Sequence, residues 1–149
     1  MHSIGDEMVK FPYVTAKSCS IKDALLMMKE LRIRHLPIAD DNKKIVGVVS
    51  DRDLREAAAL PQAEILTVSD VMKTGVYRVT ADVPLKEAVL GMANKRYGCT
   101  IVVNRRGEAI GIFTTTDALY LLADLMVGEG MEDILGFGDE YVPWATVAI

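Results

Sequence analysis

Two stretches of this chain carry nearly the same pattern, 64 residues apart. Gly47-Val48-Val49-Ser50-Asp51-Arg52-Asp53 returns as Gly111-Ile112-Phe113-Thr114-Thr115-Thr116-Asp117. The match runs without a gap from residue 6 to about residue 57, against residues 70 to about 121. Such a repeat predicts two copies of one supersecondary unit, each burying its open face against the other. Two copies also predict pseudo-two-fold symmetry and two equivalent clefts.

Each copy has the pattern of a strand, a helix, two strands and a second helix. In the first copy, residues 13–15 suit a short strand, and Ser20 suits the N-cap of a helix that ends near Arg32. Apolar positions at three- and four-residue steps give that helix one buried stripe, made of Ile21, Ala24, Leu25, Met28 and Leu31. Strands are expected at 36–39 and 45–49, and the second helix begins near Ser50 with Leu54, Ala57 and Ala58 on its apolar face.

The second copy keeps this order. Pro84 fits the first turn of a helix, strands are expected at 100–103 and 109–113, and a helix at 115–127. The sequence therefore predicts an α/β (α+β) fold of two β-α-β-β-α units. The predicted organisation is a first unit at 6–60, a connector at 61–69, a second unit at 70–127 and a C-terminal extension at 128–149.

Composition narrows the functional class. The 149 residues are 50% hydrophobic and 26% charged, with a net charge of −4, and nucleic-acid binding favours a basic surface instead. No apolar run reaches the ~18 residues of a membrane span, and the first ten residues lack the apolar core of a signal peptide. Cys19 and Cys99 do not correspond under the 64-residue offset, so we expect free thiols and a cytoplasmic location.

The two Gly-x-x-[Ser/Thr]-x-x-Asp segments and their order resemble a pair of CBS domains, named after cystathionine β-synthase. Asp6-Glu7-Met8, Asp70-Val71-Met72 and Arg34-His35-Leu36-Pro37-Ile38 are also typical of that family, and the resemblance covers about residues 6–126. It implies that the units pack through their sheets into a Bateman module, that such modules form homodimers, and that adenosine-containing ligands bind in the clefts. Nothing catalytic stands outside the repeats, so we expect a free-standing module that is not an enzyme.

Asp53 and Asp117 admit two interpretations. A carboxylate has two acceptor oxygens, which match the two adjacent hydroxyl donors of a ribose. The alternative is a capping box, in which Ser50 or Thr114 is the N-cap and the aspartate its partner three residues on. Both can hold together, because a helix N-terminus presents free N–H groups that suit a phosphate.

The charges distinguish the two copies. Arg34, His35 and Arg52 surround Asp53 in the sequence pattern, and an arginine fork suits phosphate. The positions that correspond to them in the second copy hold Gly98, Cys99 and Thr116. The sequence therefore predicts the better phosphate site at Asp53 and a weaker, empty or nucleoside-type site at Asp117. The alternatives are a solvated helix end for the arginines and a structural role for His35.

The resemblance also implies that the base of a nucleotide at one unit's aspartate lies against the other unit's first strand and the start of its second. Tyr97 is then a candidate for stacking on adenine, with core packing as the alternative. The expected residues of the better site are Arg34, His35, Ser50, Arg52, Asp53, Thr74, Val76, Tyr77 and Tyr97. Those of the weaker site are Lys10, Pro12, Tyr13, Ile33, Thr114, Thr116 and Asp117.

We therefore expect a regulatory module that binds AMP, ADP or ATP between its units and signals to a partner protein. S-adenosylmethionine and NAD share the ribose argument and stay open. No catalytic cofactor, nucleic acid partner or membrane partner is expected. No metal site is expected either, since His2 and His35 lie far apart in the sequence. The alternative is a structural dimerisation or protein-interaction module with empty clefts.

Overall fold

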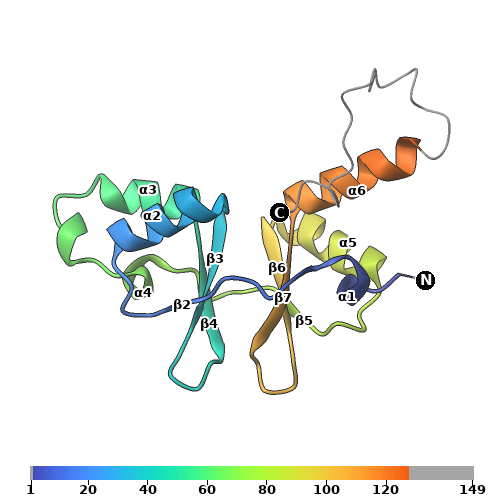
Figure 1. The fold of residues 1–149 in the computed structure, drawn as a ribbon, viewed down its shortest axis with the longest axis horizontal. Helices are drawn as coiled ribbons and strands as arrows, with labels where there is room; N and C mark the ends of the chain where they lie inside the picture. Colours follow the sequence, from blue (N-terminus) through green and yellow to red (C-terminus); the bar gives the residue numbers. More distant parts are fainter. Residues whose placement is uncertain (1, 128–149) are drawn as a thin grey trace.

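The structure, a computed structural model, describes residues 2–127. Two units lie side by side, with their sheets toward the centre and their helices on the outer sides (Figure 1). This arrangement confirms the α/β class and the two-unit organisation that the repeat predicted. The predicted extension at 128–149 lies outside the described residues. Within residues 2–127 no helix is long and apolar enough to cross a membrane.

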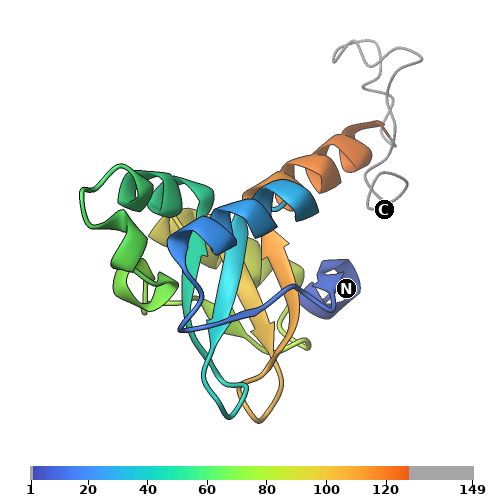
Figure 2. The ribbon, with the colours of Figure 1, turned by 60° about the vertical axis from the view of Figure 1, so that its left-hand side comes forward.

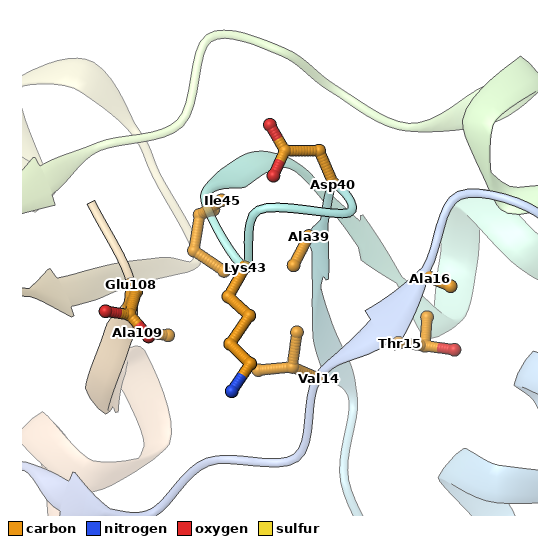
Figure 3. Close-up of a pocket in the computed structure, with 9 residues that line it drawn as sticks. All are labelled: Val14, Thr15, Ala16, Ala39, Asp40, Lys43, Ile45, Glu108 and Ala109. Atoms are coloured by element: carbon orange, nitrogen blue, oxygen red, sulfur yellow. The ribbon is translucent and has the colours of Figure 1, made fainter. Parts of the chain in front are cut away.

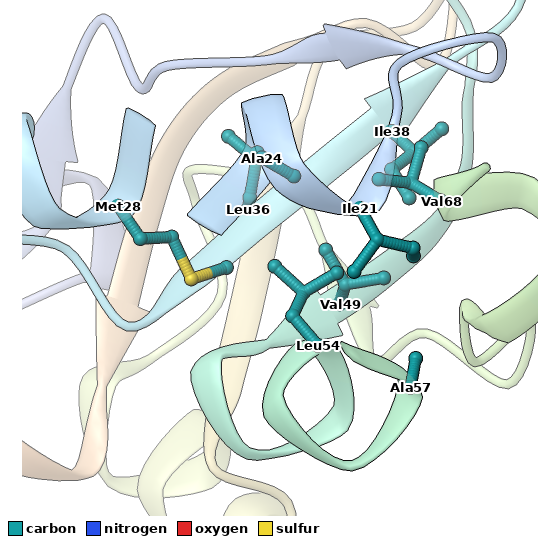
Figure 4. Packing of buried hydrophobic residues seen from close by; sticks show 9 residues of the cluster. All are labelled: Ile21, Ala24, Met28, Leu36, Ile38, Val49, Leu54, Ala57 and Val68. Carbon is teal, nitrogen blue, oxygen red and sulfur yellow. The ribbon is translucent and has the colours of Figure 1, made fainter. Parts of the chain in front are cut away.

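The first unit is a three-stranded sheet covered by two helices. Strand β2 (Thr15–Ala16) pairs in parallel with β3 (His35–Ala39), which pairs antiparallel with β4 (Ile45–Ser50). Helices α2 (Ile21–Leu31) and α3 (Asp51–Ala58) bury their apolar faces on this sheet. Figure 4 shows the resulting core, whose members are Ile21, Ala24, Met28, Leu36, Ile38, Val49, Leu54, Ala57 and Val68.

The second unit repeats the plan. Strands β5 (Arg78–Val79) and β6 (Cys99–Val103) are parallel, and β6 pairs antiparallel with β7 (Ala109–Thr114). Helices α5 (Leu85–Lys95) and α6 (Thr115–Val127) belong to this half. The hairpins β3–β4 and β6–β7 point the same way and lie next to each other (Figures 1 and 2). A third apolar cluster, centred on Ile45, Cys99 and Ile101, joins the two sheets.

The two units exchange their leading segments. Helix α1 (Ile4–Glu7) and strand β1 (Val9–Lys10) precede the first unit but join the second, because β1 pairs with β7 and Ile4 is fully buried in the second core. In return, helix α4 (Val68–Val71) packs on the first unit, with Val68 fully buried there. A bridge between Val48 and Lys73 continues this exchange. The units are thus held together by backbone as well as by side chains.

The exchange explains the Asp-x-Met segments. Ser3 and Thr67 are N-caps of α1 and α4, and the carboxylates of Asp6 and Asp70 accept from their N–H groups at 2.8 Å. The sulfur of Met72 occupies the space that a side chain at Gly47 would need, and Met8 does the same at Gly111. Each motif glycine therefore admits the methionine of the other unit's leading segment, which is the close-packing interpretation of Gly47.

Several local expectations need correction. The first strand occupies 15–16 rather than 13–15, and β3 and β4 each extend one residue further than expected, to His35 and Ser50. Ala58 is exposed, because α3 ends there and turns away from the core. The predicted connector at 61–69 contains a short 3-10 helix, η1 (Ala63–Ile65), and the start of α4. Ser20 caps α2 as expected, accepting from the Asp23 N–H at 3.0 Å.

Candidate ligand site

Asp53 lies at the first turn of α3, where its carboxylate completes a capping box. The Ser50 N–H donates to Oδ2 of Asp53 at 3.1 Å, and the Asp53 N–H donates to Oγ of Ser50 at 3.1 Å. The other oxygen, Oδ1, lies 3.6 Å from the ammonium of Lys73, and 17% of the Asp53 side chain is exposed. The capping interpretation is therefore right for one oxygen, while the second oxygen points toward the other repeat.

Asp117 repeats the geometry at the start of α6. Its Oδ2 accepts from the N–H and the hydroxyl of Thr114 at 2.8 and 2.9 Å. The residue that corresponds to Lys73 under the 64-residue offset is Val9, which has no charge. We call two residues 64 positions apart twins. The two aspartates are thus twins in their helix caps but differ in the side chain supplied by the exchanged segment.

His35 lies between the two helix starts. Burial lowers its pKa, and the carboxylate of Asp53 opposes this shift, followed by a smaller opposing effect of Asp117. Lys73 and Arg34 add to the lowering. The Nε2 atom of His35 is 2.7 Å from the position that a Cβ on Gly98 would take, so the glycine leaves the room that the imidazole fills. His35 is therefore a largely neutral, half-buried group, and both aspartates affect its pKa.

The cations expected at Asp53 are only partly where the sequence placed them. Arg34 is exposed beside His35, and its carbonyl accepts from the Asp51 N–H at 2.8 Å. Arg52 points along α3 instead, where its Nε lies 3.2 Å from Glu56 and its side chain is 87% exposed. Lys73 was not among the expected residues. Its signal in the sequence was its place directly after Asp70-Val71-Met72, the segment that the fold exchanges.

The expected base-binding residues lie in the second unit. Tyr77 and Tyr97 stack on each other with ring centroids 5.8 Å apart and planes at 24°, and the Lys95 ammonium lies 5.3 Å from the centre of the Tyr77 ring. Tyr97 therefore already has an aromatic neighbour. Val76 packs at the edge of the cluster between the units, while Thr74 is exposed.

Residues expected at the weaker site flank β7 and α2. Lys10 pairs with Gly111 in the sheet, which brings the leading segment to the second unit's motif strand. Tyr13 is 52% exposed and Thr116 is exposed, whereas Pro12 is half-buried. Ile33 packs against the first unit's core. Lys10 thus lies next to the strand that leads to Asp117, whereas the Ile33 side chain packs against the core of the first unit.

Metal binding and nucleophilic catalysis by cysteine find little support in the described part of the chain. Residues 2–127 contain no group of three or more His, Cys, Asp or Glu side chains that could hold a metal ion. Cys19 and Cys99 are both free thiols, as expected. Burial raises the pKa of Cys99 to about 12, which keeps this thiol protonated and unsuited to nucleophilic attack.

Comparison with known proteins agrees with this fold. The CBS domain family model matches twice, over residues 4–60 and 68–124. A putative acetoin utilization protein from Vibrio cholerae has a TM-score of 0.76 at 33% identity, covering 87% of this chain and 96% of that one.

Two similar structures contain ligands. The CBS domain pair of protein MJ0100, in complex with 5'-methylthioadenosine and S-adenosyl-L-methionine, has a TM-score of 0.77 at 25% identity, covering 84% of this chain and 98% of that one. CBSX2 in complex with AMP has a TM-score of 0.72 at 27% identity, with the same coverage.

Curated relatives set this region in a wider context. The chain spans 24%, 22% and 23% of the length of three enzymes that it matches, so the similarity concerns a quarter of each. The repeat, the exchanged leading segments and the two family matches together identify the fold as a tandem arrangement. The chain belongs to the CBS domain family, as a pair of CBS domains.

Proposed function

We propose that this CBS pair is a regulatory module that binds an adenine nucleotide at Asp53 and signals to a partner protein in the cytoplasm. The observation that carries the proposal is the approach of Lys73, from the second repeat, to within 3.6 Å of the Asp53 carboxylate of the first. A nucleotide here would meet one acceptor for its ribose and one cation for its phosphate, supplied by different units.

The acceptor is suited to a ribose because only part of it is engaged. A carboxylate offers about four lone-pair sites. In Asp53 the Oδ2 atom accepts one N–H from Ser50, and Oδ1 faces Lys73. Remaining lone pairs can accept a ribose hydroxyl, in keeping with the ribose-containing ligands of the MJ0100 and CBSX2 structures.

The charges favour different ligands at the two aspartates. Lys73 and Arg34 both lower the pKa of His35 beside Asp53, so two cations lie near enough to Asp53 to pair with the phosphates of AMP, ADP or ATP. At Asp117 the twin of Lys73 is Val9, so we assign to that end a nucleoside-type ligand such as 5'-methylthioadenosine. NAD and S-adenosylmethionine share the ribose and serve as further test ligands.

Signalling follows from the shared site. A ligand shifts a conformational equilibrium only through different affinities for the two arrangements. Because Asp53 and Lys73 belong to different repeats, the affinity for a nucleotide that contacts both depends on the relative position of the two repeats. The twins Leu26 and Leu90, on α2 and α5, are 51% and 50% exposed. We propose that these apolar positions contribute to a homodimer that transmits the change.

Calorimetric titration with AMP and with 5'-methylthioadenosine tests this function. Wild type should bind AMP, Asp53→Ala should weaken AMP binding by about 10- to 100-fold, and Asp117→Ala should leave it within about threefold. Mass spectrometry of small molecules released from the purified protein would identify a co-purified ligand. No binding of any adenosine compound, or equal loss in both variants, would refute the assignment.

A structural interaction module is the second candidate. It is favoured by the capping boxes, which engage both aspartates without any ligand. In that case Asp53→Ala would lower stability through the lost cap, but adding AMP would leave the Tm of the wild type unchanged. Sedimentation of Leu26→Glu and Leu90→Glu variants would then report whether these helices carry the association.

A further inference from the structure

A pocket of about 340 Å³ is lined by residues that include the turns of the β3–β4 and β6–β7 hairpins (Figure 3), and neither Asp53 nor Asp117 is among them. Its lining is mainly apolar and includes three charged residues, Asp40, Lys43 and Glu108. Both units contribute to its lining, which consists of Val14, Thr15, Ala16, Ala39, Asp40, Lys43, Ile45, Glu108 and Ala109. The volume is at the lower end of the range for small-molecule sites.

At the twin position the protein supplies a cation that reaches from one unit to the other. The twin of Val14 is Arg78, whose Nη2 donates to the carbonyl of Ile45 in the other unit at 2.9 Å. In addition the Ile45 N–H donates to the Gly107 carbonyl at 3.0 Å, and the Lys44 side chain packs at Gly107. An arginine side chain thus donates across the two units on one side, whereas Val14 on the other side has no side-chain donor.

The pocket keeps the twin of one acceptor that Arg78 uses. The twin of the Ile45 carbonyl is that of Ala109, which lines the pocket. The twin of Lys44 is Glu108, so a carboxylate replaces a cation on this wall. A guanidinium or ammonium group entering from solvent would therefore meet a carbonyl and a carboxylate, whereas Arg78 donates to the carbonyls of Val76 and Ile45.

Lys43 supplies the opposite charge. Figure 3 shows its side chain running beside Val14, with Glu108 and Ala109 on the facing side. Its backbone is left-handed, with φ of 65°, at the position where the other unit has Gly107 with φ of 79°. A lysine is strained there, and such strain persists where the surroundings enforce it. Neither Lys43 nor Glu108 takes part in an ion pair within residues 2–127.

We propose that this pocket binds a small linear molecule that places a guanidinium or ammonium group at Glu108 and Ala109, and at its other end an α-carboxylate at Lys43 and an α-ammonium at Asp40. The chemical class is an amino acid with a cationic side chain, and its aliphatic stem would lie along Val14, Ala39 and Ile45. The ligand takes the role that Arg78 performs in the twin cleft. The site is separate from the nucleotide site and does not depend on it.

Calorimetric titration and thermal melting with L-arginine, agmatine and valerate test the proposal. L-arginine should bind, with a Tm rise of about 4 °C at ten times its Kd. Agmatine lacks the carboxylate and valerate lacks both cationic groups, so each should bind about tenfold more weakly or not at all. Absence of L-arginine binding at millimolar concentration would overturn the proposal.

Variants locate the binding. Val14→Arg should copy Arg78, close the pocket and abolish L-arginine binding, while Arg78→Val, the matched control, should leave it intact. Lys43→Met should weaken L-arginine about tenfold without affecting agmatine, and Glu108→Gln should weaken both. Equal effects of Lys43→Met on the two compounds, or full L-arginine binding by Val14→Arg, would overturn the assignment.

The nucleotide site provides an independent readout. Asp53→Ala should leave L-arginine binding unchanged, and Val14→Arg should leave AMP binding unchanged, because the two sites share no residue. A loss of L-arginine binding in Asp53→Ala would place the compound in the nucleotide cleft and overturn the separate pocket. Retained AMP binding in Val14→Arg also shows that this variant is folded.

Discussion

The ammonium of Lys73 lies 3.6 Å from Oδ1 of Asp53, although the two residues belong to different repeats. The contact exists because the segment before the second unit pairs with β4 of the first, through the Val48–Lys73 bridge. The same exchange occurs at β1 and β7, where Val9 replaces the lysine. One substitution between twins therefore makes one aspartate face a cation and leaves the other without it.

Replacing Lys73 with methionine should separate phosphate recognition from ribose recognition. The side chain is 73% exposed, so the charge is well solvated and its effect moderate. We expect Lys73→Met to weaken AMP by about 3- to 10-fold and to leave adenosine, which is AMP without its phosphate, unchanged at the Asp53 site, measured by calorimetry. Lys22→Met, on an exposed position of α2, is the matched control. Equal weakening of both ligands would show that Lys73 acts only by supporting Asp53.

The capping and ligand roles of Asp53 can be separated with Ser50. Ser50→Ala removes the hydroxyl that accepts from the Asp53 N–H and should cost about 1 kcal/mol of stability in urea unfolding. Its AMP affinity should stay within about threefold, because the carboxylate remains. Asp53→Ala should show a similar loss of stability and also lose AMP. If both variants lost AMP equally, Asp53 would matter only through the helix start.

His35 should make stability depend on pH below neutrality. Its pKa in the fold is lowered, chiefly by burial, so the unfolded chain takes up a proton first. The free energy of unfolding should therefore fall as pH drops below the unfolded value of about 6.5, down to the lowered pKa of the fold. Asp53 and Asp117 limit this loss, while Lys73 and Arg34 increase it.

Urea unfolding between pH 5 and 7.5 measures this dependence. His35→Gln should flatten the curve in that window. An unchanged slope in His35→Gln would assign the pH dependence to other groups.

Much of this fold was accessible from the sequence because the repeat imposes it. The 64-residue offset, the apolar stripes and the caps Ser20 and Ser50 predicted both units and most boundaries. The exchange of α1 and α4 was not predicted, since periodicity describes a segment's own structure and not the sheet that it joins. Short elements such as β1, with two residues, carry no period at all.

The candidate site could also be predicted in part from the sequence. Aspartates at helix starts follow from local spacing, and the capping boxes confirm that part of the analysis. Lys73 was missed because its proximity to Asp53 depends on the exchange. Arg52 was placed at the site from its neighbourhood in sequence, yet its partner four residues on, Glu56, draws it along the helix. The pocket at Val14 depends on how twin side chains differ in three dimensions.

Gly91 should be sensitive to a single methyl group, and Gly75 should not. A Cβ on Gly91 would collide with the Tyr77 hydroxyl and ring, whereas nothing lies within 4 Å of one on Gly75. Gly91→Ala gains about 1 kcal/mol of helix propensity in α5 but should lose about 1–3 kcal/mol through this overlap. We expect net destabilisation in urea and a near-ultraviolet dichroism change from the displaced Tyr77–Tyr97 pair. Gly75→Ala should stay within about 0.5 kcal/mol of wild type. A Gly91→Ala variant more stable than wild type, with unchanged aromatic dichroism, would show that Tyr77 can move away without cost and that its stacking on Tyr97 is not fixed by the helix.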